Sequence, residues 1–164
     1  MAIVKGRKMS EIKYLSFSDI NPDDFLVIVN EDSLRTHLIE HAYFDSSSIR
    51  EWVEDKIKVD ALPGCRIRAV YIDGSLAGWC GIQPDDSGFE LAIVISKNFW
   101  GYGINIFKSL MIWAAELGHE EVLFHLLESR REYSALKKMA DKVQKTELLG
   151  RVFTTYFISV RRQY

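Results

Sequence analysis

The segment Glu90-Leu-Ala-Ile-Val-Ile-Ser-Lys-Asn-Phe-Trp-Gly-Tyr-Gly-Ile-Asn105 decides the expected fold. Its first six residues are almost all apolar and predict a short buried strand. A turn with two glycines follows, and apolar residues then recur at helical spacing from Ile104 to Leu117. A second apolar strand is expected from Val122 to Leu127. Strand, helix and strand in this order predict a parallel strand pair with a right-handed crossover.

The chain before this segment predicts two helices and a hairpin. Cap signals at residues 21–24 and 45–48 each begin a helix, and Pro63-Gly64 ends the second one. Period-two patterns on either side of Asp73-Gly74, at residues 66–72 and 76–82, predict the hairpin.

The chain after this segment predicts one more helix and one more strand. Leu136, Met139, Ala140 and Val143 share a helical face, so a helix is expected at 131–143, and a strand from Val152 to Val160 closes the chain. The expected fold class is mixed α/β, or α+β.

Length and composition predict one domain over residues 1–164. The chain has 164 residues, of which 48% are hydrophobic and 27% charged, and it shows no internal repeat or linker composition. A formal net charge of −2 gives no general attraction to phosphate backbones or anionic lipids, so neither a nucleic acid nor a membrane is expected as a partner. Two cysteines, Cys65 and Cys80, are too few for a disulfide framework, which favours a cytoplasmic location.

The turn after the first parallel strand predicts an anion site. Gly101 and Gly103 permit positive φ and close approach of the backbone. Successive N–H groups from Tyr102 to Asn105 can then point at one pyrophosphate, at the positive end of the helix dipole.

A dinucleotide would be a competing ligand for this turn, with Glu128 as the acid that binds the ribose. The dinucleotide motif needs a third glycine where this chain has Ile106, and it follows its strand closely, whereas residues 96–100 intervene here. The chain also has only one strand-helix-strand unit. The dinucleotide hypothesis is therefore set aside.

The turn resembles motif A of the GNAT superfamily of N-acetyltransferases, whose usual form is Gln/Arg-x-x-Gly-x-Gly/Ala. Here the six positions read Trp100-Gly101-Tyr102-Gly103-Ile104-Asn105. Its first and last positions depart from the pattern, but Phe-Trp-Gly-x-Gly is similar to the ribosomal-protein N-terminal acetyltransferase-like branch.

This resemblance implies a fold and a co-substrate. The fold is a central, mostly antiparallel twisted sheet with one parallel, splayed strand pair and flanking helices. The co-substrate is acetyl-CoA, whose pantetheine would lie between the splayed strands and bond backbone groups of Val94, Ile95 and Ser96. Its pyrophosphate would lie at the turn formed by Trp100, Gly101, Tyr102, Gly103, Ile104 and Asn105.

Glu90 is the candidate general base. It is the one ionisable side chain in the motif strand, and the branch that the chain resembles commonly has a glutamate at this position. Its neighbours Phe89 and Leu91 favour a raised pKa, suited to accepting the proton of an amine. The alternative is a structural carboxylate that pairs with Arg66 or Arg68 of the hairpin.

Tyr133 and Tyr156 are the candidate acids, since some members of the superfamily protonate the leaving thiolate with a tyrosine. No metal is expected: His37 and His41 share a helical spacing but have no evident third ligand. His125 interrupts an apolar strand and is interpreted as a hydrogen-bonded core residue. The aromatic residues Phe44, Trp52 and Trp79 either close the core or line the acceptor cleft.

The sequence therefore predicts an enzyme that transfers an acetyl group from acetyl-CoA to a primary amine. The expected acceptor is an amine of a small molecule or a peptide, and a homodimer is one option for the assembly. A non-catalytic acyl-CoA-binding module, used for sensing or assembly, is the alternative from a different class. Acetylation of a charged tRNA is a narrower alternative, which the acidic composition disfavours.

Overall fold

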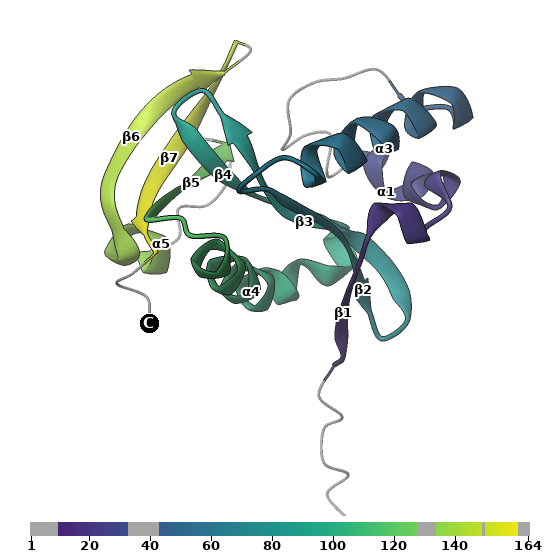
Figure 1. The fold of residues 1–164 in the computed structure, drawn as a ribbon, viewed down its shortest axis with the longest axis horizontal. Helices are drawn as coiled ribbons and strands as arrows, with labels where there is room; N and C mark the ends of the chain where they lie inside the picture. The colour runs from purple at the N-terminus through teal and green to yellow at the C-terminus, as the bar shows by residue number, and fades with distance from the viewer. Residues whose placement is uncertain (1–9, 33–42, 128–133, 149, 161–164) are drawn as a thin grey trace, which may run out of the picture.

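A computed structural model describes residues 10–32, 43–127, 134–148 and 150–160. One seven-stranded sheet runs through them in the order β1-β2-β3-β4-β5-β7-β6 (Figure 1). All neighbouring strands are antiparallel except β4 and β5, which are parallel. This is the mixed α/β fold that the sequence predicted. The strands are β1 Ile12–Leu15, β2 Arg66–Ile72, β3 Ser75–Asp85, β4 Gly88–Ile95, β5 Glu121–Leu127, β6 Ala140–Leu148 and β7 Arg151–Ser159.

Helices cover both faces of the sheet (Figure 1). Helices α1 and α3 contribute to an apolar cluster on one face, and α4 contributes to a larger cluster on the other. The helices are α1 Leu26–Val29, α3 Ser46–Asp60, α4 Gly103–Glu116 and α5 Ser134–Met139, with short 3₁₀ helices η1 Phe17–Asp19, η2 Pro22–Phe25 and η3 Lys97–Tyr102.

Alternation along β4 assigns its side chains to the two faces. Leu91 and Ile95 belong to the α4 cluster, whereas Val94 belongs to the α1 and α3 cluster. Successive side chains of a strand point to opposite faces, so Glu90 lies on the same face as Val94. The carboxylate therefore points toward the side of the sheet that α1 and α3 cover.

The local signals of the predicted hairpin and second helix are confirmed. Asp45 caps α3 through a reciprocal pair of hydrogen bonds with Ser48. At the hairpin turn, φ is 49° for Asp73 and 83° for Gly74, which are the left-handed conformations that a tight two-residue turn requires. Asn21 caps η2, at the first predicted helix start.

The predicted last helix at 131–143 is wrong in its second half. Helix α5 ends at Met139, and the chain continues from Ala140 as the edge strand β6, which pairs with β7. Most β6 side chains are exposed, so no apolar alternation marks this strand in the sequence. Pairing with β7 decided the conformation where local propensity did not.

The N-terminal part also differs from what the sequence predicted. Helix α1 ends at Val29, with Asn30 as its C-cap, and residues 33–42 lie outside the described residues. The short strand β1, which pairs with β2, was not indicated by the sequence.

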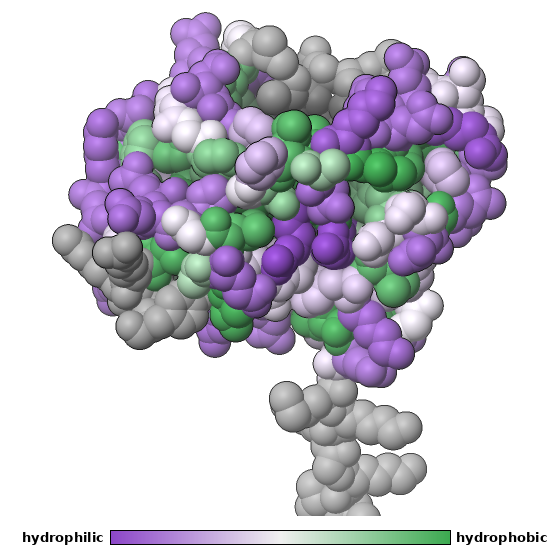
Figure 2. Space-filling view, in the orientation of Figure 1, coloured by the Kyte–Doolittle hydropathy of each residue, from purple (hydrophilic) through white to green (hydrophobic). Residues whose placement is uncertain are grey.

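Among the described residues, no helix is long and apolar enough to cross a membrane. On the face shown in Figure 2, hydrophobic residues occur in patches between hydrophilic ones. Cys65 and Cys80 are both buried and free.

Candidate active site

The parallel strands β4 and β5 pair at one position. Glu90 of β4 lies opposite Leu123 of β5, and none of residues 91–95 pairs with β5, although both strands continue. The two strands therefore diverge toward their carboxyl ends. Backbone groups of β4 that face β5 beyond Glu90 lie outside the β4–β5 ladder, and one of them, the carbonyl of Ile95, accepts a hydrogen bond from Nε1 of Trp100.

Glu90 lies at the closed end of this divergence. One carboxylate oxygen, Oε1, accepts a hydrogen bond of 2.7 Å from Nε2 of Gln83 on β3. The expected alternative, a pair with Arg66 or Arg68, does not form. Arg66 pairs with Glu116 and Arg68 with Asp60.

Burial raises the pKa of Glu90 above its ordinary value. The hydrogen bond from Gln83 and the neighbouring His125 act in the opposite direction, whereas the nearby Asp85 adds to the increase. The side chain is 22% exposed, so solvent or a substrate can still reach it. A partly buried carboxylate with a raised pKa is suited to exchange a proton near neutral pH.

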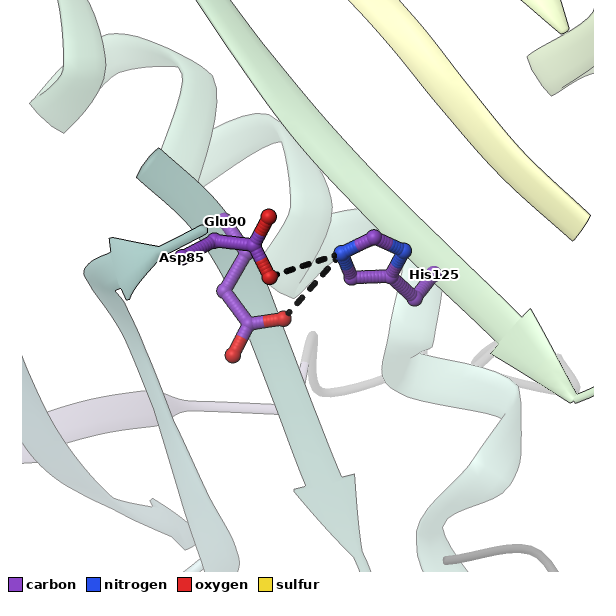
Figure 3. Close-up of side chains that lie close together, drawn as sticks. All are labelled: Asp85, Glu90 and His125. Atoms are coloured by element: carbon purple, nitrogen blue, oxygen red, sulfur yellow. Dashed lines mark hydrogen bonds and ion pairs between the residues drawn. The ribbon is translucent and has the colours of Figure 1, made fainter. Parts of the chain in front are cut away.

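His125 and Asp85 complete a cluster around Glu90 (Figure 3). Nε2 of His125 lies 3.1 Å from Oδ1 of Asp85 and 3.7 Å from Oε2 of Glu90. The interpretation of His125 as a hydrogen-bonded residue is confirmed, but the sequence did not indicate that it lies next to Glu90. The sequence predicted that β4 and β5 form a parallel pair, but it did not predict which residues of the two strands lie opposite each other.

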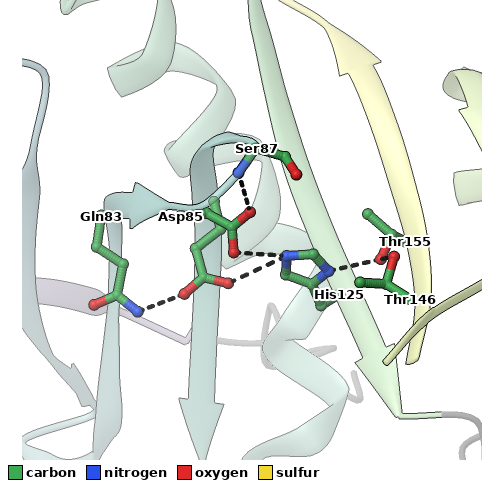
Figure 4. A network of polar contacts seen from close by, with 7 residues as sticks. Gln83, Asp85, Ser87, His125, Thr146 and Thr155 are labelled. Carbon is green, nitrogen blue, oxygen red and sulfur yellow. Dashed lines mark hydrogen bonds and ion pairs between the residues drawn. The ribbon is translucent and has the colours of Figure 1, made fainter. Parts of the chain in front are cut away.

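The cluster continues on both sides (Figure 4). Nδ1 of His125 lies 2.7 Å from Oγ1 of Thr155 on β7, and Thr155 donates to Thr146 on β6. Oδ2 of Asp85 accepts from the backbone N–H of Ser87. Five neighbouring strands, β3, β4, β5, β7 and β6, and the β3–β4 turn thus fix the positions of these side chains.

Lys56 of α3 joins the other end of the network. Its Nζ donates to Oε1 of Gln83 at 2.7 Å and lies 4.3 Å from the ring centroid of Trp79. Burial lowers the pKa of Lys56 to about 8. Trp79 is buried in the cluster with Trp52 and Phe44, so these aromatic residues close the core beside the site.

Asp85, Glu90 and His125 also offer three ligand atoms within 4.8 Å of one another, a set that a divalent cation such as Zn²⁺ could use. The 3.1 Å separation between His125 and Asp85 is that of an N–H···O hydrogen bond, which needs only a proton between the two groups. The arrangement is complete as an acid–base centre.

The predicted phosphate turn forms η3 and the first turn of α4. Gly103 has φ of −55°, and its N–H donates to the carbonyl of Trp100, so the turn does not use the positive φ that glycine permits. A Cβ at Gly101 or Gly103 would meet nothing within 4 Å. These glycines leave open space beside the backbone, while Ile104 and Asn105 are exposed at the start of α4.

The end of β4 is tied to the N-terminal part of the chain. The carboxylate of Glu31 accepts a hydrogen bond from the Ser96 hydroxyl at 2.7 Å and one from the Lys97 N–H at 3.0 Å. The Ser96 N–H donates to the carbonyl of Ala77 on β3. Trp100 Nε1 donates to the carbonyl of Ile95, and Tyr102 bonds Ser10.

Of the two candidate acids, the structure describes only Tyr156, which does not lie beside Glu90. Tyr133 lies outside the described residues, as do His37 and His41. Tyr156 is fully buried in the α4 cluster. Its neighbour Thr155 points to the opposite face, where His125 and Glu90 lie.

Comparisons with known proteins agree with this fold. No family model and no curated protein matches the sequence. Solved structures do match. A probable GNAT-family acetyltransferase from Chromobacterium violaceum is 13% identical, with a TM-score of 0.69, and the match covers 94% of this chain and 89% of that one.

Two further structures contain coenzyme. The microcin C7 self-immunity acetyltransferase MccE, solved with acetyl-CoA and AMP, has a TM-score of 0.71 at 16% identity, covering 91% of this chain and 92% of that one. The ribosomal L7/L12 N-acetyltransferase RimL, solved with coenzyme A, has a TM-score of 0.70 at 15% identity, covering 93% and 94%. The chain thus has the fold of GNAT acetyltransferases, and identities this low establish the fold alone.

Proposed function

We propose that the protein transfers an acetyl group from acetyl-CoA to a primary amine of a small molecule or a protein. The observation that carries this proposal is the position of Glu90, at the one point where β4 and β5 pair before they diverge. There its carboxylate is partly buried and fixed by Gln83, with one oxygen directed toward His125. The fold shared with MccE and RimL, which were solved with acetyl-CoA or coenzyme A, supports the same function.

Acetyl-CoA is the proposed co-substrate, and it supplies the acetyl thioester. Backbone groups of Val94, Ile95 and Ser96 remain the predicted contacts of its pantetheine. The turn from Trp100 to Asn105 would hold its phosphates. The open space beside Gly101 and Gly103 fits a ligand that approaches the backbone closely. Since the Gly103 N–H bonds Trp100, the phosphates are expected at the next N–H groups of α4, those of Ile104 and Asn105.

Glu90 is the proposed base. A primary amine attacks a thioester only in its neutral form, and most primary amines are protonated near pH 7. Oε2 of Glu90 takes that proton, and the neutral amine forms the new C–N bond as the C–S bond breaks. The second proton that the nitrogen loses goes to the departing thiolate, which leaves as the coenzyme thiol. The thiolate is a good leaving group because thiols have a pKa of about 8.5. Tyr133 and Tyr156 remain predictions as acids for the thiolate.

The proposed acceptor is any primary amine of a small molecule or a protein, without a named substrate. A similar structure from Salmonella typhimurium is described as modifying the N-terminal serine of ribosomal protein L7/L12, which favours a peptide amino terminus among the candidates. We keep the expectations of one domain over residues 1–164, a cytoplasmic location, and neither nucleic acid nor membrane as a partner. A homodimer is kept as an option. The proposed chemistry needs no metal.

The first test is calorimetric titration of the protein with acetyl-CoA and, separately, with NAD. The proposal expects 1:1 binding of acetyl-CoA and none of NAD. A panel of amines, including peptides with free amino termini, polyamines, aminoglycosides and amino acids, is then assayed for release of the coenzyme thiol. Binding without transfer to any amine would indicate the non-catalytic acyl-CoA-binding module. Absence of acetyl-CoA binding would overturn the proposal.

A further inference from the structure

Gln83 lies between a basic side chain and an acidic one. On β3 it is directly opposite Glu90 of β4 in the antiparallel register, so the two side chains lie on the same face of the sheet. Lys56 reaches the same amide from α3, one of the helices on this face, and its Nζ lies over the ring of Trp79, four residues before Gln83 on β3. The three polar groups therefore form one hydrogen-bonded chain from α3 to β4.

The two neighbours of Gln83 determine the orientation of its amide. A protonated lysine can only donate hydrogen bonds, and an ionised carboxylate can only accept them. Lys56 must therefore face the amide oxygen, and its Nζ donates to Oε1 of Gln83 at 2.7 Å. Glu90 must face the amide nitrogen, and its Oε1 accepts from Nε2 of Gln83 at 2.7 Å. Both ends of the chain require the same orientation, so a flipped amide would lose both hydrogen bonds.

The chain occupies one oxygen of Glu90 and leaves the other for a substrate. Oε1 is bonded to Gln83, whereas Oε2 lies 3.7 Å from Nε2 of His125, which is longer than a hydrogen bond. Burial raises the pKa of Glu90, and the hydrogen bond from Gln83 and the charge of Lys56 both act against that increase. The chain thus favours the ionised form of Glu90, which is the form that can accept a proton.

Other charged groups act on the two ends of this chain. His125 of β5 also lowers the pKa of Glu90, whereas Asp85 of β3 raises it. Burial lowers the pKa of Lys56 to about 8, and the charges of Glu90 and Asp55 act against this decrease. At pH 7 the ammonium form of Lys56 therefore predominates, and the lysine remains a donor to Gln83.

We infer that Lys56 and Gln83 are positioning residues for the proposed base. Lys56 fixes the amide of Gln83, and Gln83 in turn holds Oε1 of Glu90 and leaves Oε2 for the amine. Neither residue exchanges a proton in the reaction. The inference rests on the proposed acetyl transfer, because that reaction is what makes Glu90 a base. The hydrogen-bonded chain itself can be tested without any substrate.

The first test is an NMR titration of the wild-type protein that needs no acceptor. In protein with ¹³C-labelled glutamate, the side-chain carboxyl carbon of Glu90 reports its ionisation, and Glu90→Gln identifies the resonance by its loss. The side-chain N–H of Gln83 that bonds Glu90 should shift with the same midpoint, because its hydrogen bond strengthens when the carboxyl group ionises. A Gln83 amide that does not follow this titration overturns the inference.

The second test removes each hydrogen-bond partner in turn. Gln83→Met and Lys56→Met keep a long side chain but cannot make the bond. The Glu90 titration should move to higher pH in both variants, so that its ionised fraction on the acid side of the midpoint falls about threefold or more. In the double variant the shift should be smaller than the sum of the two single shifts, because Lys56 acts through Gln83.

Matched controls for these variants are Gln144→Met and Lys58→Met, which change exposed residues and should leave the Glu90 midpoint unchanged. An unchanged midpoint in both Gln83→Met and Lys56→Met overturns the inference. Fully additive shifts in the double variant also overturn it, because Gln83 would then not transmit the effect of Lys56.

The pH dependence of turnover connects this chain to the reaction. Thiol release with the best amine of the panel should fall about threefold or more in Gln83→Met and in Lys56→Met on the acid side of the profile, and the loss should shrink as the pH rises. A role in folding alone would lower the turnover equally at every pH, and that result overturns the inference. Loss of acetyl-CoA binding in the wild-type protein would overturn the proposed function instead, and it would leave the NMR midpoints as they are.

Discussion

The carboxylate of Glu90 is the residue on which the proposed chemistry depends. Glu90→Gln keeps the side-chain volume but cannot accept the proton of an amine. We expect acetyl-CoA to bind as in the wild type and turnover to fall about a hundredfold. Wild-type turnover should also fall when the solution is acidified through the pKa of Glu90, which burial raises.

Calorimetry and a pH series of thiol-release rates measure these two effects. Glu121→Gln, which changes an exposed acid on β5, is the control. Normal acetylation by the Glu90 variant at neutral pH would show that another group is the base.

Lys56 supports a second residue-scale prediction, on stability. Burial lowers its pKa from an ordinary 10.5 to about 8, so between these values the unfolded chain binds a proton that the folded chain does not. The free energy of unfolding should therefore increase as the pH rises from about 8 toward 10.5, and Lys56 should contribute at most about 1.4 kcal/mol per pH unit to this increase.

Urea unfolding of the wild-type protein and of Lys56→Met at pH 8 and pH 10 measures this gain. The difference between the two proteins should shift in favour of the wild type at the higher pH. Lys58→Met, an exposed lysine on the same helix, should show no such shift. A pH-independent difference for Lys56→Met would contradict the lowered pKa.

At the scale of elements, substitutions at the start of α4 should affect stability and acetyl-CoA binding in opposite directions. A Cβ at Gly103 fits without contact, and φ there is already helical, so Gly103→Ala should stabilise the fold by about 0.5 kcal/mol. The same methyl group would stand in the space proposed for phosphate, so acetyl-CoA affinity should decrease. Gly103→Glu should abolish acetyl-CoA binding because it adds a negative charge there.

Thermal unfolding and calorimetry of these variants test this separation. Ile112→Glu places a carboxylate on an exposed position of α4 remote from its first turn, and it should bind acetyl-CoA normally. Tight acetyl-CoA binding by Gly103→Glu would show that the phosphates bind elsewhere on the protein.

For the whole molecule, we predict that metal removal leaves activity unchanged. A proton already satisfies the geometry between His125 and the two acids, and amine acetylation needs no Lewis acid. Dialysis against EDTA should leave the turnover number within about twofold of the untreated protein. A large loss that Zn²⁺ or Mn²⁺ reverses would instead assign Asp85, Glu90 and His125 to a metal.

The sequence predicted the parts of the molecule whose signals are local. The cap at Asp45, the turn at Asp73-Gly74 and the apolar runs of β4, α4 and β5 each depend on residues close in the chain, and each was confirmed. Strand β6 was mistaken for helix because its pairing with β7 supplies the stabilisation that its exposed side chains do not.

The site was predictable only in part for the same reason. Glu90 is visible as an acid in an apolar strand, but its partners come from two other strands, β3 and β5. His125 meets it because β5 lies beside β4, and Asp85 meets it because β3 and β4 form a hairpin. Such neighbours depend on strand register, which a single sequence does not specify.

We expect Glu31 to couple the binding of acetyl-CoA to the binding of the acceptor. It follows α1, on the side of the sheet to which Glu90 points, and its carboxylate bonds the hydroxyl of Ser96 and the N–H of Lys97 just before the phosphate turn. A ligand that moves the segment after α1 should then change the free energy of the phosphate turn, and a ligand at the phosphate turn should change that of the segment after α1. Such coupling is reciprocal. Acetyl-CoA should alter acceptor affinity by the same factor as the acceptor alters acetyl-CoA affinity, and Glu31→Gln should bring that factor closer to one.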